Sequence, residues 1–111
     1  MNKCEMQLMI GWTTVPSEEK AKEILQFLLN KKLIACGQIH GPVCSIYEWR
    51  NKIEEDTEWR ITLKFKSTNQ NKIYKCFDEI HPYETPQWVF WEVNSSEEYR
   101  NWVCKNTHHS N

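Results

Sequence analysis

The sequence predicts an α+β domain of the ferredoxin-like plan, with elements in the order β-α-β-β-α-β and a short helix at the end. Two segments repeat apolar residues with helical spacing, and residues 57–66 alternate apolar and polar residues as a half-exposed strand does. A chain of 111 residues suggests one domain. We place it at residues 1–104 and expect a polar, disordered tail at residues 105–111.

The first half of the chain predicts a buried strand followed by an amphipathic helix. Residues 7–15 are apolar and rich in β-formers, and Pro16 closes the run. Ser17 can cap the helix that follows. The apolar face of that helix consists of Ala21, Ile24, Leu25, Leu28 and Leu29.

The middle of the chain predicts a long antiparallel hairpin. Residues 33–40 and 43–50 form one strand if Gly41-Pro42 is a bend within it. Asn51 can adopt the left-handed conformation that reverses the chain, and residues 57–66 return. The apolar face of the return strand consists of Trp59, Ile61, Leu63 and Phe65.

A second helix starts at Ser67 or Thr68 and ends at His81, because Pro82 disfavours helical geometry in the residue before it. The strand at residues 87–93 is apolar on both faces, which is typical of a strand covered on both sides.

The end of the chain predicts a short helix and an oligomer. Ser95 and Glu98 are spaced as a capping box for the final helix. The plan leaves one sheet face without helices, and that face is too apolar to stay in water. With six tryptophans in so short a chain, we expect self-association.

Composition excludes several classes of protein. The 14 basic and 15 acidic residues form no basic stripe, so neither nucleic acid nor an anionic membrane is an expected partner. The N-terminal apolar run is too short for a signal peptide or a membrane span. Five cysteines without a CxxC pair favour free thiols in a reducing compartment, so we expect a cytoplasmic protein.

No residue pattern indicates an enzyme, since there is no nucleophile signature and no glycine-rich phosphate loop. Most of the paired carboxylates fall at helix starts or at the hairpin tip, where we interpret them as caps or solvated residues.

Candidate metal ligands lie in three places. Cys36, His40 and Cys44 are four residues apart, which is ~13 Å on a strand, so neighbouring members cannot share one ion locally. A site shared between strands or subunits stays open, and so does a packing role for both cysteines. His81 is the second candidate, and His108-His109 in the tail is at most an adventitious pair.

The segment "HPYETP" at residues 81–86 has two interpretations that its residues alone leave open. It can be a helix stop with a rigid connector, because Pro82 and Pro86 stiffen it. It can also be a preorganised group of His81, Tyr83 and Glu84 that lines a cleft and binds a cation or a small polar ligand.

Together, these pieces resemble the CutA family of divalent-cation tolerance proteins over residues 6–103. "HPYETP" is similar to the family signature His-Pro-Tyr-Glu-x-Pro. The further matching pieces are Pro16-x-Glu18, Lys32 to Cys36, Ser45-Ile46-Tyr47-x-Trp49, Lys52 to Glu55, Glu58, Lys64 and Tyr99-x-x-Trp102.

The resemblance implies a ferredoxin-like subunit in a homotrimer similar to the P-II signalling proteins, with a polar cluster in clefts between subunits. It implies tolerance to copper and other divalent cations, and animal relatives are tied to anchoring of an acetylcholine-hydrolysing enzyme. The metal ligands that it implies are His81, Cys36 and Glu58. The other cleft residues are Lys64, Tyr83, Glu84, Tyr47, Trp49 and Trp102.

Two positions depart from the bacterial copper-binding pattern of the family, because Thr13 replaces a cysteine and Ile80 replaces the first of two histidines. We therefore expect a non-enzymatic homotrimer that binds a divalent metal ion, Cu²⁺ or Zn²⁺, only weakly and does not need it to fold. The alternatives are a P-II-like sensor of a small anion, motivated by Lys64 beside a charged His81, and a trimeric scaffold for a protein partner.

Overall fold

The elements follow the predicted order in a computed structural model, which describes residues 6–107. They are β1 (Leu8–Val15), α1 (Glu18–Asn30), β2 (Cys36–Trp49), β3 (Lys52–Lys66), α2 (Gln70–Ile80), β4 (Val89–Glu92) and α3 (Glu97–Lys105), with a 3-10 turn at Ser67–Asn69 before α2. The strands form one antiparallel sheet in the order β2-β3-β1-β4. The predicted fold class is confirmed.

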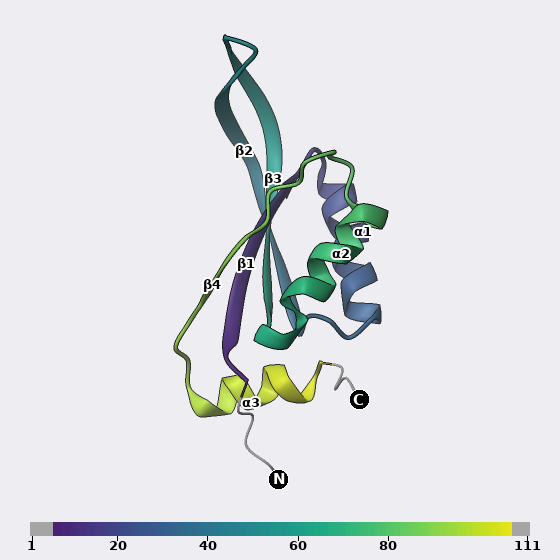
Figure 1. Cartoon of the computed structure of the whole chain (residues 1–111), viewed down its shortest axis with the longest axis vertical. Helices are drawn as coiled ribbons and strands as arrows, with labels where there is room; N and C mark the ends of the chain where they lie inside the picture. Colours follow the sequence, from purple (N-terminus) through teal and green to yellow (C-terminus); the bar gives the residue numbers. More distant parts are fainter. Residues whose placement is uncertain (1–5, 108–111) are drawn as a thin grey trace.

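One face of the sheet carries α1 and α2, and the core lies between these layers (Figure 1). The predicted inner face of β3 is confirmed, because Ile61, Leu63 and Phe65 are fully buried and Trp59 packs against the same core. Helix α3 lies across the end of the sheet where β1 begins (Figure 1), with the Lys64 ammonium 5.6 Å from the centre of the Tyr99 ring.

Both long helices begin and end for local reasons. The Ser17 hydroxyl caps α1 by accepting a hydrogen bond of 3.1 Å from the Lys20 amide. Helix α2 ends at His81, whose ψ of 133° is extended, as expected for a residue before proline. Within α1, the predicted face is buried except for Leu29, which is 39% exposed.

The β2–β3 hairpin extends far beyond the helices (Figure 1) and gives the described residues a length of 54 Å against widths of 26 and 21 Å. The turn uses left-handed φ angles of 52° at Arg50 and 67° at Asn51. The predicted bend at Gly41-Pro42 is confirmed by a register shift between His40 and Val43. A Cβ on Gly41 would lie 2.4 Å from the Trp59 ring, so glycine is required there.

The prediction that the last strand is covered on both sides is wrong within this chain. Strand β4 lies at the sheet edge with only β1 beside it, and Val89, Phe90 and Trp91 are 44%, 36% and 39% exposed. Only Trp88, just before the strand, reaches inward, where it stacks 5.6 Å from Phe65. The apolar residues on both faces of β4 are therefore left uncovered by the described part of this chain.

Two local predictions near the C-terminus need correction, and a third is not tested. The cap of α3 is Ser96 rather than Ser95, because the Ser96 hydroxyl accepts the bond from the Tyr99 amide. The tail begins later than expected, since Thr107 is buried and its hydroxyl donates to the Val103 carbonyl. Residues 108–111, with the His108-His109 pair, lie outside the described residues.

The cysteine prediction is wrong at one position. Cys104 is disulfide-bonded, whereas Cys36, Cys44 and Cys76 carry free thiols. Among residues 6–107, no helix has the length and apolar character needed to cross a membrane.

Two adjacent leucines of α1 should differ in how much stability is lost when each is replaced by alanine. Leu28 is fully buried and Leu29 faces outward, so Leu28→Ala should lower the free energy of unfolding by about 2–5 kcal/mol. The matched control Leu29→Ala should cost less than about 1 kcal/mol. Urea unfolding at one protein concentration measures both, and equal losses would contradict the assignment of the buried face.

Candidate functional site

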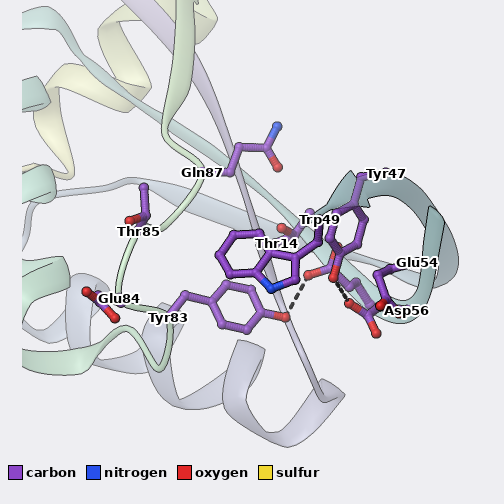
Figure 2. Close-up of a pocket in the computed structure, with 10 residues that line it drawn as sticks. Thr14, Tyr47, Trp49, Glu54, Asp56, Tyr83, Glu84, Thr85 and Gln87 are labelled. Carbon is purple, nitrogen blue, oxygen red and sulfur yellow. Dashed lines mark hydrogen bonds between the residues drawn. The ribbon is translucent and has the colours of Figure 1, made fainter. Parts of the chain in front are cut away.

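A pocket of about 580 Å³ lies between the hairpin and the connector that follows α2. We call it the hairpin pocket. Its lining residues are the carboxylates Glu54, Asp56, Glu58 and Glu84, the aromatic residues Tyr47, Trp49 and Tyr83, and the polar residues Thr14, Thr85 and Gln87. The rings of Tyr47, Trp49 and Tyr83 gather with Asp56 (Figure 2).

The charge of the hairpin pocket is negative, since four carboxylates and no lysine, arginine or histidine line it. Carboxylates accept hydrogen bonds and the faces of aromatic rings attract cations. The lining therefore favours a cation over an anion.

Two tyrosine–carboxylate hydrogen bonds shape the pocket (Figure 2). The Tyr83 hydroxyl donates to a Glu58 carboxylate oxygen at 2.6 Å, which ties the connector to β3, and the Tyr47 hydroxyl donates to Asp56 across the hairpin. The bond to Asp56, followed by burial, raises the pKa of Tyr47 to about 12. Burial, followed by the bond to Glu58, raises the pKa of Tyr83. Both phenols therefore remain protonated donors at neutral pH.

His81 is held by hydrogen bonds on both ring nitrogens. The Tyr83 amide donates to Nδ1 at 3.2 Å, so Nδ1 is the acceptor nitrogen of a neutral ring. Nε2 then carries the proton and donates to the Thr13 hydroxyl at 2.9 Å. Burial lowers the pKa of His81 to about 4, although a backbone hydrogen bond with Thr14 and the charge of Glu58 act in the opposite direction.

These bonds assign His81 a role in fixing the connector and leave neither ring nitrogen free to bind a metal ion. Thr13 takes part directly, at one of the positions where the sequence departs from the copper-binding pattern. The two interpretations of "HPYETP" are both partly met, because His81 holds the corner while Tyr83 and Glu84 line the pocket.

The structure brings some of the expected site residues together and separates others. Tyr47, Trp49, Glu58, Tyr83 and Glu84 all line the hairpin pocket. Cys36 does not, because it pairs with Lys64, six residues along β3 from Glu58, which corresponds to roughly 20 Å.

Trp102 is part of α3 and Lys64 lies beside that helix, and neither residue lines the hairpin pocket. The Lys64 ammonium lies over the ring of Tyr99. The Trp102 ring stacks on the same tyrosine, with the two ring centres 5.7 Å apart. Within residues 6–107, no three His, Cys, Asp or Glu side chains are grouped closely enough to hold a metal ion.

Sequence reasoning missed Glu54 and Asp56, which it assigned to a solvated hairpin tip. The signal that could have found them is their spacing, since Glu54, Asp56 and Glu58 occupy alternate positions of one strand and so share a face. Thr14, Thr85 and Gln87 carry no such signal, because only the fold brings them to the pocket.

Comparison with known proteins places the chain in a family. The family described as "CutA1 divalent ion tolerance protein" matches residues 9–106, nearly the whole chain. The chain belongs to this family. The signature segment that carries the resemblance is thus also the segment that closes the hairpin pocket in this CutA1-family chain.

Relatives agree in sequence and in fold. The divalent-cation tolerance protein CutA of Thermotoga maritima is 37% identical over 97 residues, which cover 86% of this chain and 95% of that protein. The protein CutA homolog of Xenopus laevis is 32% identical, and the match covers 86% of this chain and 64% of the frog protein. A crystal structure of the divalent ion tolerance protein CutA1 from Ehrlichia chaffeensis superposes with a TM-score of 0.91, at 31% identity, covering 96% of this chain and 100% of that one.

The lowered pKa of His81 predicts how stability depends on pH. Between about pH 6.5, the ordinary value for histidine, and about pH 4, the unfolded chain binds a proton at His81 that the folded chain does not. The contribution of His81 to stability is therefore present above pH 6.5 and is lost as the pH falls toward 4.

Urea midpoints measured from pH 4 to 7 check this dependence. His81→Asn should flatten the profile between pH 6.5 and 4, whereas His40→Asn, at an exposed position of β2, should leave it as in the unmodified chain. Parallel profiles for the unmodified chain and His81→Asn would contradict a buried neutral His81.

Proposed function

We propose that this CutA1-family chain acts in tolerance of divalent cations as a homotrimer that binds Cu²⁺ or Zn²⁺ weakly at clefts between subunits. The observation that carries the proposal is the hairpin pocket, in which four carboxylates face a space with no basic side chain in its lining. The role is one of binding rather than catalysis. A cytoplasmic location stays a prediction from the sequence.

Glu58 is the centre of the proposed metal site. It is the one candidate ligand of the three, His81, Cys36 and Glu58, that lines the pocket, and its second oxygen is free of the bond from Tyr83. For His81 to join, its bond with Thr13 or with the Tyr83 amide would have to break. Cys36 would have to come from a neighbouring subunit.

Weak binding follows from this arrangement. A carboxylate-rich site is a poor match for Cu²⁺ and Zn²⁺, which prefer nitrogen and sulfur ligands, and one chain supplies no compact set of three donors among its described residues. We expect folding not to need the ion, because the core between the sheet and helices α1 and α2 is built from packed apolar side chains such as Ile24, Leu28 and Phe65.

The trimer is supported by apolar side chains that one subunit leaves uncovered. Ile46 and Ile53 on the hairpin are 65% and 72% exposed, and Trp91 on the edge strand β4 is 39% exposed although its ring lies 5.0 Å from that of Trp12. Patches of this kind mark surfaces that pack against another protein. The alternative of a scaffold for a different protein rests on the same surfaces and is kept as the second candidate.

The alternative of an anion sensor has lost the observation that motivated it. His81 bonds to Thr13, whose neighbour on β3 is Ile61. Lys64 lies three residues further along that strand, so it faces the other side of the sheet. With its pKa lowered to about 4, His81 is also uncharged at neutral pH.

Calorimetric titration with Cu²⁺ and Zn²⁺ tests the metal site. Glu58→Gln keeps an oxygen that accepts from Tyr83 but removes the charge, so affinity should fall about tenfold. Glu55→Gln, one residue along the same strand and outside the pocket lining, is the matched control and should bind as the unmodified chain does. Isotherms that do not differ between the two variants would exclude Glu58 as a ligand.

Light scattering after size exclusion tests the trimer. The unmodified protein should have three times the chain mass of 13.4 kDa. Trp91→Glu should reduce this mass to that of a monomer, because it buries a charge in the subunit contact. Tyr74→Glu, at an exposed aromatic residue of α2, should remain a trimer. A monomeric unmodified protein would overturn this part of the proposal.

A further inference from the structure

The negative charge of the hairpin pocket is arranged as a row. Glu54, Asp56 and Glu58 occupy alternate positions of β3, and all three line the pocket. Alternate residues of a strand face the same side and lie ~7 Å apart, so the row is ~14 Å long. The row extends beyond the single carboxylate at the centre of the proposed metal site, because the donors to one metal ion converge on one point at 2.0–2.6 Å, whereas these carboxylates are spread along the strand.

Aromatic rings stand beside this row. Tyr47 lies directly opposite Glu54 in the strand register, Trp49 follows on the same face, and Tyr83 reaches in from the connector. The hydroxyls of both tyrosines are used on Asp56 and Glu58. The surface that remains for a ligand therefore consists mainly of ring faces and carboxylate oxygens, as the gathered side chains in Figure 2 illustrate.

From this juxtaposition we propose that the hairpin pocket binds a linear aliphatic polyammonium ion, a ligand of the polyamine class. Ammonium groups repeated along a flexible chain match carboxylates repeated along a strand, through charge-assisted hydrogen bonds. The methylene segments pack on the rings of Tyr47, Trp49 and Tyr83, and an ammonium group over a ring face adds a cation–π interaction. A volume of about 580 Å³ suits a small organic molecule and is far larger than a bare ion needs.

Three basic side chains beside the pocket are not part of its lining. Arg60 pairs with Thr14 across the sheet, but its guanidinium lies 4.1 Å from the centre of the Trp12 ring. The Arg50 guanidinium lies 5.5 Å from the centre of the Trp49 ring, and Lys52 is the strand neighbour of Trp49, but neither residue is part of the pocket lining. The Arg50 guanidinium over the Trp49 ring is an example of the cation–π interaction that this ring can form. No basic side chain of the lining pairs with the carboxylate row, so the row is open to a cationic ligand.

Calorimetric titration of the full-length protein with spermidine tests the inference. Glu54→Gln removes one charge of the row and should weaken binding about threefold. Trp49→Leu keeps an apolar side chain but removes the ring, and should weaken binding about fivefold. The matched controls are Glu55→Gln, beside the row, and Trp102→Leu, at an exposed tryptophan of α3. Both should change the affinity for spermidine less than about twofold, because neither side chain lines the pocket.

Three results would overturn the inference. One is the absence of spermidine binding, and another is equal weakening by Glu54→Gln and Glu55→Gln, which would indicate diffuse attraction to an acidic hairpin. The third is a change in oligomeric state by Trp49→Leu and Glu54→Gln with spermidine binding unaltered, since the pocket would then be a contact between copies of the chain.

This inference does not rest on metal binding. Protein that binds spermidine but no Cu²⁺ or Zn²⁺ supports the inference and contradicts the proposed function. Protein that binds those ions but no spermidine does the reverse.

Discussion

The length of the β2–β3 hairpin is the constraint on which the rest of the molecule depends. Helices α1 and α2 cover the sheet, but the hairpin runs past them and has no layer of its own chain to pack against (Figure 1). Its far half therefore exposes Ile46, Trp49 and Ile53. The same extension creates the pocket, because the connector after α2 and the end of β1 at Thr14 stand beside the hairpin there. Uncovered apolar surface and an acidic pocket thus have one cause.

The connector takes a defined shape because its side chains form hydrogen bonds with two strands of the sheet. His81 holds β1 through Thr13, and Tyr83 holds β3 through Glu58 at 2.6 Å. Burial keeps the ring of His81 neutral, with both nitrogens occupied, so the histidine that looks most like a metal ligand in the sequence positions the corner instead. The carboxylate that Tyr83 orients is the group that faces the pocket.

Local patterns predicted most of the fold, and contacts distant in sequence account for what they missed. Ser17, the periodic face of α1 and the stop at Pro82 act within one or two turns, so the residues alone predict them. The prediction that β4 is covered on both sides is wrong, because apolar residues on both faces of a strand do not show which neighbour would cover them. Cys36 and Glu58 look equivalent as ligands until the register places them six residues apart along β3. The sequence places Glu54 and Asp56 at a solvated hairpin tip, because it does not show that the aromatic rings of the pocket lie beside these carboxylates.

Anomalous diffraction from crystals soaked in Cu²⁺ tests most directly whether the acidic hairpin pocket is the cation site of this chain. The account predicts a copper peak within ~2.5 Å of a Glu58 carboxylate oxygen, with the bond from His81 to Thr13 intact. A peak on the His81 ring with that bond broken, or copper bound only outside the pocket, would contradict it.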